Sequence, residues 1–101
     1  MTLETIRKDL KEIRYYFGMI DLFNSGSKLI PPKEIVEKVN KYNLAVSHAP
    51  ARLYATYVGL YVNNNTQAVL ADDWGYSTEH IKRLNNKLCS FFREYFENQN
   101  Q

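Results

Sequence analysis

The stretch "TQAVLADDWGYSTEHIKRLN", residues 66–85, contains the pattern that decides the fold of this chain. Thr66 follows three asparagines and precedes a run with helical apolar spacing, so we expect its hydroxyl to cap a helix by accepting a bond from a free backbone N–H. Gly75 stands where the chain must leave that helix through a left-handed conformation, which glycine adopts at little cost. Ser77 or Thr78 then caps a second helix. The stretch therefore predicts two helices joined by a short turn.

The spacing of three residues in this stretch favours a helix-turn-helix. Such a motif needs a small residue where its helices approach, a glycine four residues later for the turn, and a branched apolar residue six further to lock the second helix. Here these residues are Ala71, Gly75 and Ile81. The inner positions around them are also apolar, namely Leu70, Trp74, Tyr76 and Leu84. A generic helical hairpin is the alternative, because these residue types recur at such spacings by chance.

The rest of the chain also has helical periodicity. In the first twenty residues the apolar positions are Leu3, Ile6, Leu10, Ile13, Phe17 and Ile20. This spacing predicts one amphipathic helix, which ends near the turn formers of residues 24–27. A second helix opens with Pro32 at its first helical position. A third follows Pro50, because the residue before a proline is pushed out of the α region.

No stretch alternates with the period of a strand, so the sequence predicts an all-α protein. We expect a small bundle of about five helices with a helix-turn-helix at its C-terminal end. Residues 1–101 would form a single domain, in which an N-terminal helical pair (1–47) precedes the helix-turn-helix part (49–96).

The apolar seam of the first helix has two interpretations. Its spacing is that of a heptad repeat, which could pair two chains into a homodimer with Asp9 near Arg14 of the partner helix. Alternatively the seam packs on the second helix of its own chain. We favour packing within the chain, because fewer than three heptads seldom sustain a free coiled coil.

Charge and hydropathy limit the classes of protein that fit. The 101 residues contain 13 Lys and Arg against 11 Asp and Glu, a net charge of +2, whereas dedicated DNA-binding domains are often strongly basic. No apolar run is long enough to span a membrane, and the N-terminus "MTLETIRKDLKEI" is too charged for a secretory signal. We therefore expect a cytoplasmic protein with no membrane association.

The sequence offers little for catalysis or metal binding. The single cysteine, Cys89, lies on an apolar helical face, so we expect it to be buried rather than reactive. His48 lies far from His80, which we expect to be exposed, and neither has Cys or carboxylate partners at ligand spacing, so no metal is predicted. No nucleophile and base pair, no paired carboxylates and no glycine-rich phosphate loop occur. The chain is therefore predicted not to be an enzyme and to use no cofactor.

Residues 49–92, "APARLYATYVGLYVNNNTQAVLADDWGYSTEHIKRLNNKLCSFF", resemble region four of sigma factors and the related phage late-gene activators of the RinA and ArpU type. The shared features are a proline-led helix, a polar link and the pattern T-x-x-x-x-A-x-x-W-G-x-S-x-x-x-I. The resemblance covers under half of the chain and its motif is moderately specific. In that family the second helix of the pair enters the major groove of DNA.

The resemblance implies a set of DNA-contacting residues. Base contacts would fall on Ser77, Thr78, Glu79, Lys82, Arg83 and Asn86. Thr66 and Gln67 would meet phosphate. Lys87 joins Lys82 and Arg83 in a basic cluster, which can hold phosphate or pair with guanine, although an ordinary solvated helix surface explains such a cluster too.

Two features depart from the family pattern. Val69 replaces a common glutamate, and Asp72 and Asp73 place two negative charges on the first helix of the pair. By the helical period both acids point to solvent, where they could contact a protein such as RNA polymerase.

The sequence therefore predicts a sequence-specific regulator of transcription that binds double-stranded DNA. Its abundant Asn, Lys, Tyr and Ile suggest a phage or mobile element of an AT-rich bacterium. The alternative is a protein of the same fold that binds RNA polymerase or a host factor instead.

Overall fold

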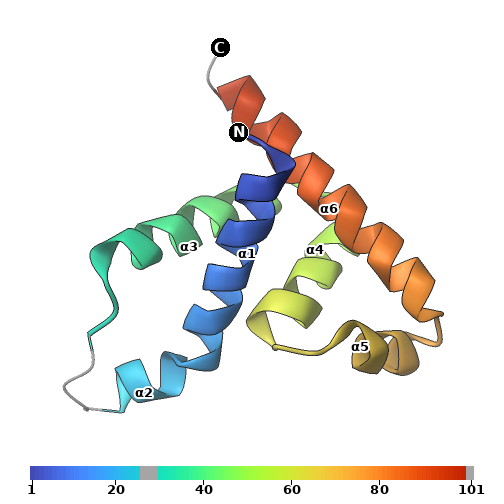
Figure 1. Cartoon of the computed structure of the whole chain (residues 1–101), viewed down its shortest axis with the longest axis horizontal. Coiled ribbons are helices and arrows are strands. Elements are labelled where there is room, and N and C mark those ends of the chain that lie inside the picture. Colours follow the sequence, from blue (N-terminus) through green and yellow to red (C-terminus); the bar gives the residue numbers. More distant parts are fainter. Residues whose placement is uncertain (26–29, 100–101) are drawn as a thin grey trace.

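Helical periodicity in the sequence is matched by helices along the chain (Figure 1). The computed structural model describes residues 1–25 and 30–99, and that part of the chain contains no strand. Its elements are α1 (Leu3–Gly18), α2 (Ile20–Asn24), α3 (Lys33–Val46), α4 (Ala51–Tyr57), the π-helix η1 (Val58–Val62), α5 (Gln67–Trp74) and α6 (Thr78–Gln99). The predicted small all-α fold is confirmed. The turn predicted at residues 24–27 lies partly outside the described residues.

The first helix is shorter than its apolar spacing predicts. Thr2 caps α1, because its Oγ1 accepts a hydrogen bond from the Thr5 N–H at 3.1 Å. The helix ends at Gly18, and Met19 has φ −104° and ψ 0°, outside the α region. The prediction of one continuous helix that ends near residues 24–27 was therefore wrong, because the chain leaves the α region at Met19. Glycine weakens the last turn of α1, and the short α2 begins separately at Ile20.

The apolar seam of α1 packs inside its own chain. Ile6, Leu10 and Ile13 are at most 1% exposed. They lie in the main core, whose other members come from α3, α4 and α6, and α1 also contacts η1. The apolar seam of α1 therefore packs against more elements than α3, the one partner helix that the sequence predicts. With its central residues already covered, it leaves little apolar surface for a coiled coil with a second chain.

Asp9 and Arg14, which a parallel dimer would bring together, have other partners. The Tyr42 hydroxyl donates to Asp9 Oδ2 at 2.6 Å, and Lys38 Nζ lies 3.0 Å from Asp9 Oδ1. Arg14 donates to Asn64 instead. The two residues that the dimer alternative would bring together thus have partners within one chain, in line with the favoured packing within the chain.

The Asp9 network fastens α1 to α3. Lys38 also pairs with Glu12, and this bond, with those to Asp9, raises the pKa of the Lys38 ammonium group. Burial, helped by the bond to Asp9, raises the pKa of the Tyr42 hydroxyl far above its ordinary value. Both groups therefore keep the protonated form that donates to the carboxylates. A buried acceptor such as Asp9 is tolerated because it has these donors.

The helices α3 and α4, which the sequence predicts as the second and third helices, each follow a proline. Pro32 has φ −57° and ψ 142°, so it is the residue before the first turn of α3 and not, as predicted, its first helical residue. Pro50 has the same role for α4. The predicted interruption between these helices is confirmed, since α3 ends at Val46 and α4 begins at Ala51.

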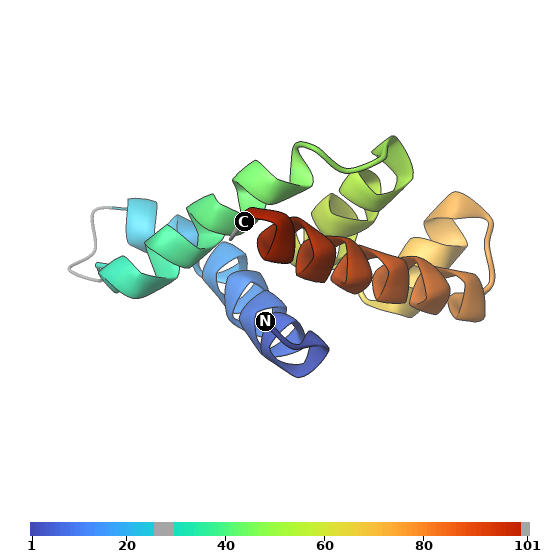
Figure 2. The same ribbon diagram turned by 90° about the horizontal axis from the view of Figure 1, so that it is seen from above.

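The interior consists of two clusters joined by α6. The larger lies among α1, α3, α4 and α6, and the smaller contains Leu60, Leu70, Ala71, Ile81 and Leu84. Cys89 is buried in the larger one, as predicted. Figure 2 shows α6 running from α5 at one end of the molecule to the middle of the molecule, where it lies beside α3. Across the described residues, no helix combines the length and the apolar character needed to cross a membrane.

We predict that Tyr42→Phe lowers the free energy of unfolding by about 1–3 kcal/mol, because it removes a donor from the buried Asp9 carboxylate. Urea denaturation followed by circular dichroism measures the change. Tyr15→Phe is the matched control, since Tyr15 is 68% exposed and should tolerate the loss of its hydroxyl. Equal stability of Tyr42→Phe and the unaltered protein would contradict the account of this network.

Candidate nucleic-acid interface

The helix α5 is closed at both ends as the sequence predicts. The Thr66 Oγ1 accepts a hydrogen bond from the Val69 N–H at 3.1 Å. Gly75 has φ 72° and ψ 29°, the left-handed conformation, and follows the last residue of the helix. The Tyr76 N–H then donates to the Ala71 carbonyl at 2.9 Å, which satisfies a free carbonyl at the helix end. The predicted cap and turn residues are both confirmed.

The helix α6 begins directly after this turn. The Ser77 Oγ accepts a hydrogen bond from the His80 N–H at 3.1 Å, so Ser77 is the cap of the two candidates. Thr78 is the first residue of the helix. Only two residues, Tyr76 and Ser77, therefore separate Gly75 from α6, and the directions of the two helices are fixed over a short distance.

The inner faces of α5 and α6 meet at the predicted apolar positions. Leu70, Ala71, Ile81 and Leu84 are buried, and Trp74 and Tyr76 are half-buried beside them. Leu60 of η1 completes this small cluster. The helices α5 and α6 therefore both pack against η1, the element that precedes them in the chain.

The π-helix η1 was not expected from the sequence, and it sets how closely α5 approaches. A Cβ atom built on Gly59 would lie 2.8 Å from Leu70 Cδ1, which is too close for an ordinary contact. The Asn63 N–H donates to the Val58 carbonyl at 2.8 Å, five residues back. A glycine inside an otherwise helical run was the available signal of close packing.

A cluster of aromatic rings and one arginine braces the turn from the α4 side. The Arg52 guanidinium lies 5.7 Å from the ring centroid of Trp74 and 5.3 Å from that of Tyr76. The Tyr76 ring is 4.4 Å from the ring of His80. His80 was expected to be exposed, but this contact leaves it half-buried. This aromatic cluster therefore joins α4, the turn and the first turns of α6.

We predict that Gly75→Val lowers the free energy of unfolding by more than about 1 kcal/mol, because a β-branched residue is strained at positive φ. No atom lies within 4 Å of an added Cβ, so the cost arises in the backbone and not from a clash. Gly75→Asn is the matched control, since asparagine tolerates this region better and should lose less. Urea denaturation of both variants gives the comparison, and equal losses would contradict the backbone explanation.

The structure brings most of the predicted DNA-contacting residues onto the exposed surface of α6 and the turn before it. The exposed members are Ser77, Thr78, Glu79, Lys82, Arg83, Asn86 and Lys87. Thr66 is exposed at the start of α5, and Gln67 is partly covered. Asp72 and Asp73 are also exposed, as the helical period predicted.

Asn86 has a side-chain partner on another helix of the chain. Arg7 Nη2 of α1 donates to Asn86 Oδ1 at 3.1 Å. A bidentate contact to adenine uses both the oxygen and the nitrogen of an asparagine amide, so Arg7 competes for one of them. Asn86 is therefore less available for a base contact of this kind. Sequence reasoning missed Arg7, since nothing local links it to a residue 79 positions away.

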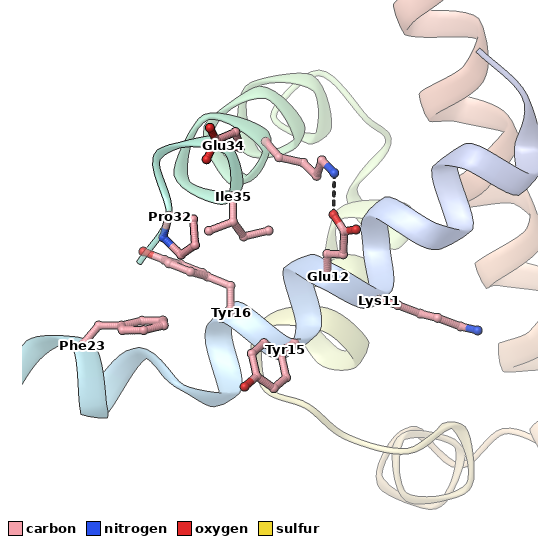
Figure 3. Close-up of a pocket in the computed structure, with 9 residues that line it drawn as sticks. Lys11, Glu12, Tyr15, Tyr16, Phe23, Pro32, Glu34 and Ile35 are labelled. Carbon is pink, nitrogen blue, oxygen red and sulfur yellow. Dashed lines mark hydrogen bonds and ion pairs between the residues drawn. The ribbon is translucent and has the colours of Figure 1, made fainter. Parts of the chain in front are cut away.

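A separate pocket of about 570 Å³ lies among α1, α2 and α3 (Figure 3). Its apolar wall includes Tyr16, Phe23 and Ile35, and its Lys38 is already paired with Asp9 and Glu12. None of the predicted site residues lines it. Lys11, Tyr15 and Glu34 are further polar residues of its lining.

No protein-family model, no curated protein and no solved structure matches this chain. The functional inference therefore depends on the side chains and geometry of this molecule.

Proposed function

We propose that this protein is a sequence-specific DNA-binding regulator of transcription that places the N-terminal turns of α6 in the major groove. The observation that carries the proposal is the exposed polar and basic surface of residues 77–83, which follows a short turn braced by buried side chains. In Figure 2 this end of α6 lies with α5 at one extremity of the molecule. A groove can therefore approach it without meeting α2 or α3.

The dimensions and chemistry of this surface suit duplex DNA. An α-helix with its side chains is about 10–12 Å across, and the major groove is about 12 Å wide. Arg83 can donate two hydrogen bonds to guanine, and Lys82 can neutralise a phosphate. Neither side chain takes part in an ion pair found among the described residues, so both charges are available.

The start of α5 supplies a second anchor in this proposal. Thr66 and Gln67 precede and begin α5, close in sequence to Asn64, which Arg14 of α1 holds. Hydroxyl and amide groups at a helix start commonly bind phosphate and set the register of a protein on DNA. They would orient α6 and leave base recognition to its own side chains.

A protein partner is the second candidate, favoured by a different surface. Asp72 and Asp73 are exposed on α5, and Val69 is 48% exposed on the same helix. An acidic surface with an apolar residue suits a basic protein such as a polymerase subunit. Because these side chains differ from Lys82 and Arg83, separate variants distinguish the two candidates.

We predict that Lys82→Ala and Arg83→Ala each weaken DNA binding while thermal stability stays nearly unchanged, because exposed charges contribute little to folding. Loss of Arg83 should cost about 1–3 kcal/mol and relax preference at one base pair. Loss of Lys82 should weaken all sequences alike and reduce the salt slope by about one unit. Fluorescence anisotropy, with a duplex selected from a randomised pool and its scrambled form, measures both effects.

The control for these variants is Asp72→Ala with Asp73→Ala, which should not weaken DNA binding. If the unaltered protein enriches no sequence from the pool and binds the duplex no better than a scrambled one, the proposal of sequence-specific binding fails. The acidic surface of α5 would then become the preferred candidate.

A further inference from the structure

A row of basic residues on α1 runs beside the candidate interface. Arg7, Lys11 and Arg14 are four and three residues apart, which places them on one side of the helix. Arg7 donates to Asn86 of α6 at 3.1 Å. At the other end, Arg14 Nε donates to Asn64 Oδ1 at 3.2 Å, just before α5. The row is therefore attached both to α6 and to the segment that leads into α5.

The middle of this row is open to solvent. Lys8 and Lys11 are exposed, and with Arg7 and Glu4 they line a shallow hollow of about 520 Å³. Glu4 is the acidic member of that lining. None of the three cations forms an ion pair found within residues 1–25 and 30–99.

Of the three acids of α1, Glu4 lies among these cations and the other two are paired with α3. Asp9 and Glu12, two acids of the same helix, are both paired with Lys38 of α3. Their negative charge is thus held on the α3 side, away from Arg7 and Lys11. A modest net charge of +2 for the whole chain hence coexists with a concentrated basic surface.

We propose that this surface of α1, formed by Arg7, Lys8, Lys11 and Arg14, binds the sugar–phosphate backbone of the duplex whose major groove receives α6. The inference rests on the proposed function. A helix nearly fills the major groove, so an element packed beside it lies over a wall of the groove, and that wall is phosphate backbone. The contact between Arg7 and Asn86 places α1 beside α6 in this way.

The arginines can serve both neighbours at once. A guanidinium has five N–H donors in a rigid fork, and Arg7 uses one of them for Asn86. The remaining donors suit phosphate oxygens. Lys8 and Lys11 add point charges whose contribution is electrostatic and independent of sequence.

The test uses the full chain carrying Lys8→Ala with Lys11→Ala, since both residues are exposed and neither supports another element. The probe is a fluorescein-labelled random-sequence duplex several helical turns long, titrated across a range of salt concentrations. We expect the slope of log affinity against log salt to fall by about two units, one for each lost cation. Base preference on a selected duplex and the melting curve should stay as in the unaltered protein.

Lys33→Ala is the matched control, because Lys33 is an exposed lysine on α3 with only a surface partner, Glu37. Its salt slope should equal that of the unaltered protein, and a fall like that of the α1 variant would overturn the assignment to this surface. An unchanged slope for the α1 variant, with binding still weakened by Lys82→Ala and Arg83→Ala, would overturn the α1 proposal while leaving the proposed function standing. Failure of the unaltered protein to bind any duplex would overturn both.

Discussion

The continuous apolar stripe of α6 is the constraint on which the other elements depend. Its first part, with Ile81 and Leu84, closes the small cluster under α5, and its later part, with Leu88 and Phe92, lies in the core beside α1 and α3. One helix of 22 residues therefore sets the positions of both halves. The polar side of the same helix is presented at a fixed angle as a result. The fold and the candidate site thus share α6. Because its apolar side is buried, the direction of its polar side is fixed.

Local features were predictable from the sequence, and long-range ones were not. Thr66, Gly75 and Ser77 act through backbone groups a few residues away, so each signal is contained in the stretch around it. The bond between Arg7 and Asn86 and the pairing of Asp9 with Tyr42 join distant segments. No local pattern encodes such partners, so the sequence could not identify Tyr42 and Lys38 as the partners of Asp9. The sequence does not predict the π-helix, because Gly59 alone does not show which helical turn contains the additional residue of a π-helix.

The net charge of +2 does not describe how charge is distributed over the proposed DNA-binding surface. Several acids lie apart from the proposed surfaces: Asp9 and Glu12 are held by Lys38, and Asp72 and Asp73 lie on α5, whereas Glu4 lies on α1 and Glu79 on α6. The contact between Arg7 and Asn86 joins α1 to α6, and both helices carry exposed cations. The net charge of a sequence averages over its acidic and basic surfaces, whereas a duplex would contact one side of the molecule.

The most direct test of the central claim is a nitrogen-15 amide NMR titration of the protein with duplex DNA selected from a randomised pool. The account predicts shifts that concentrate in residues 77–87 of the turn and α6, with further shifts in residues 7–14 of α1, and little change in α3. The amides around the pocket among α1, α2 and α3 report a different mode of binding. Shifts confined to that pocket or to Asp72 and Asp73, or no shifts at all, would contradict the assignment of the α6 surface to DNA.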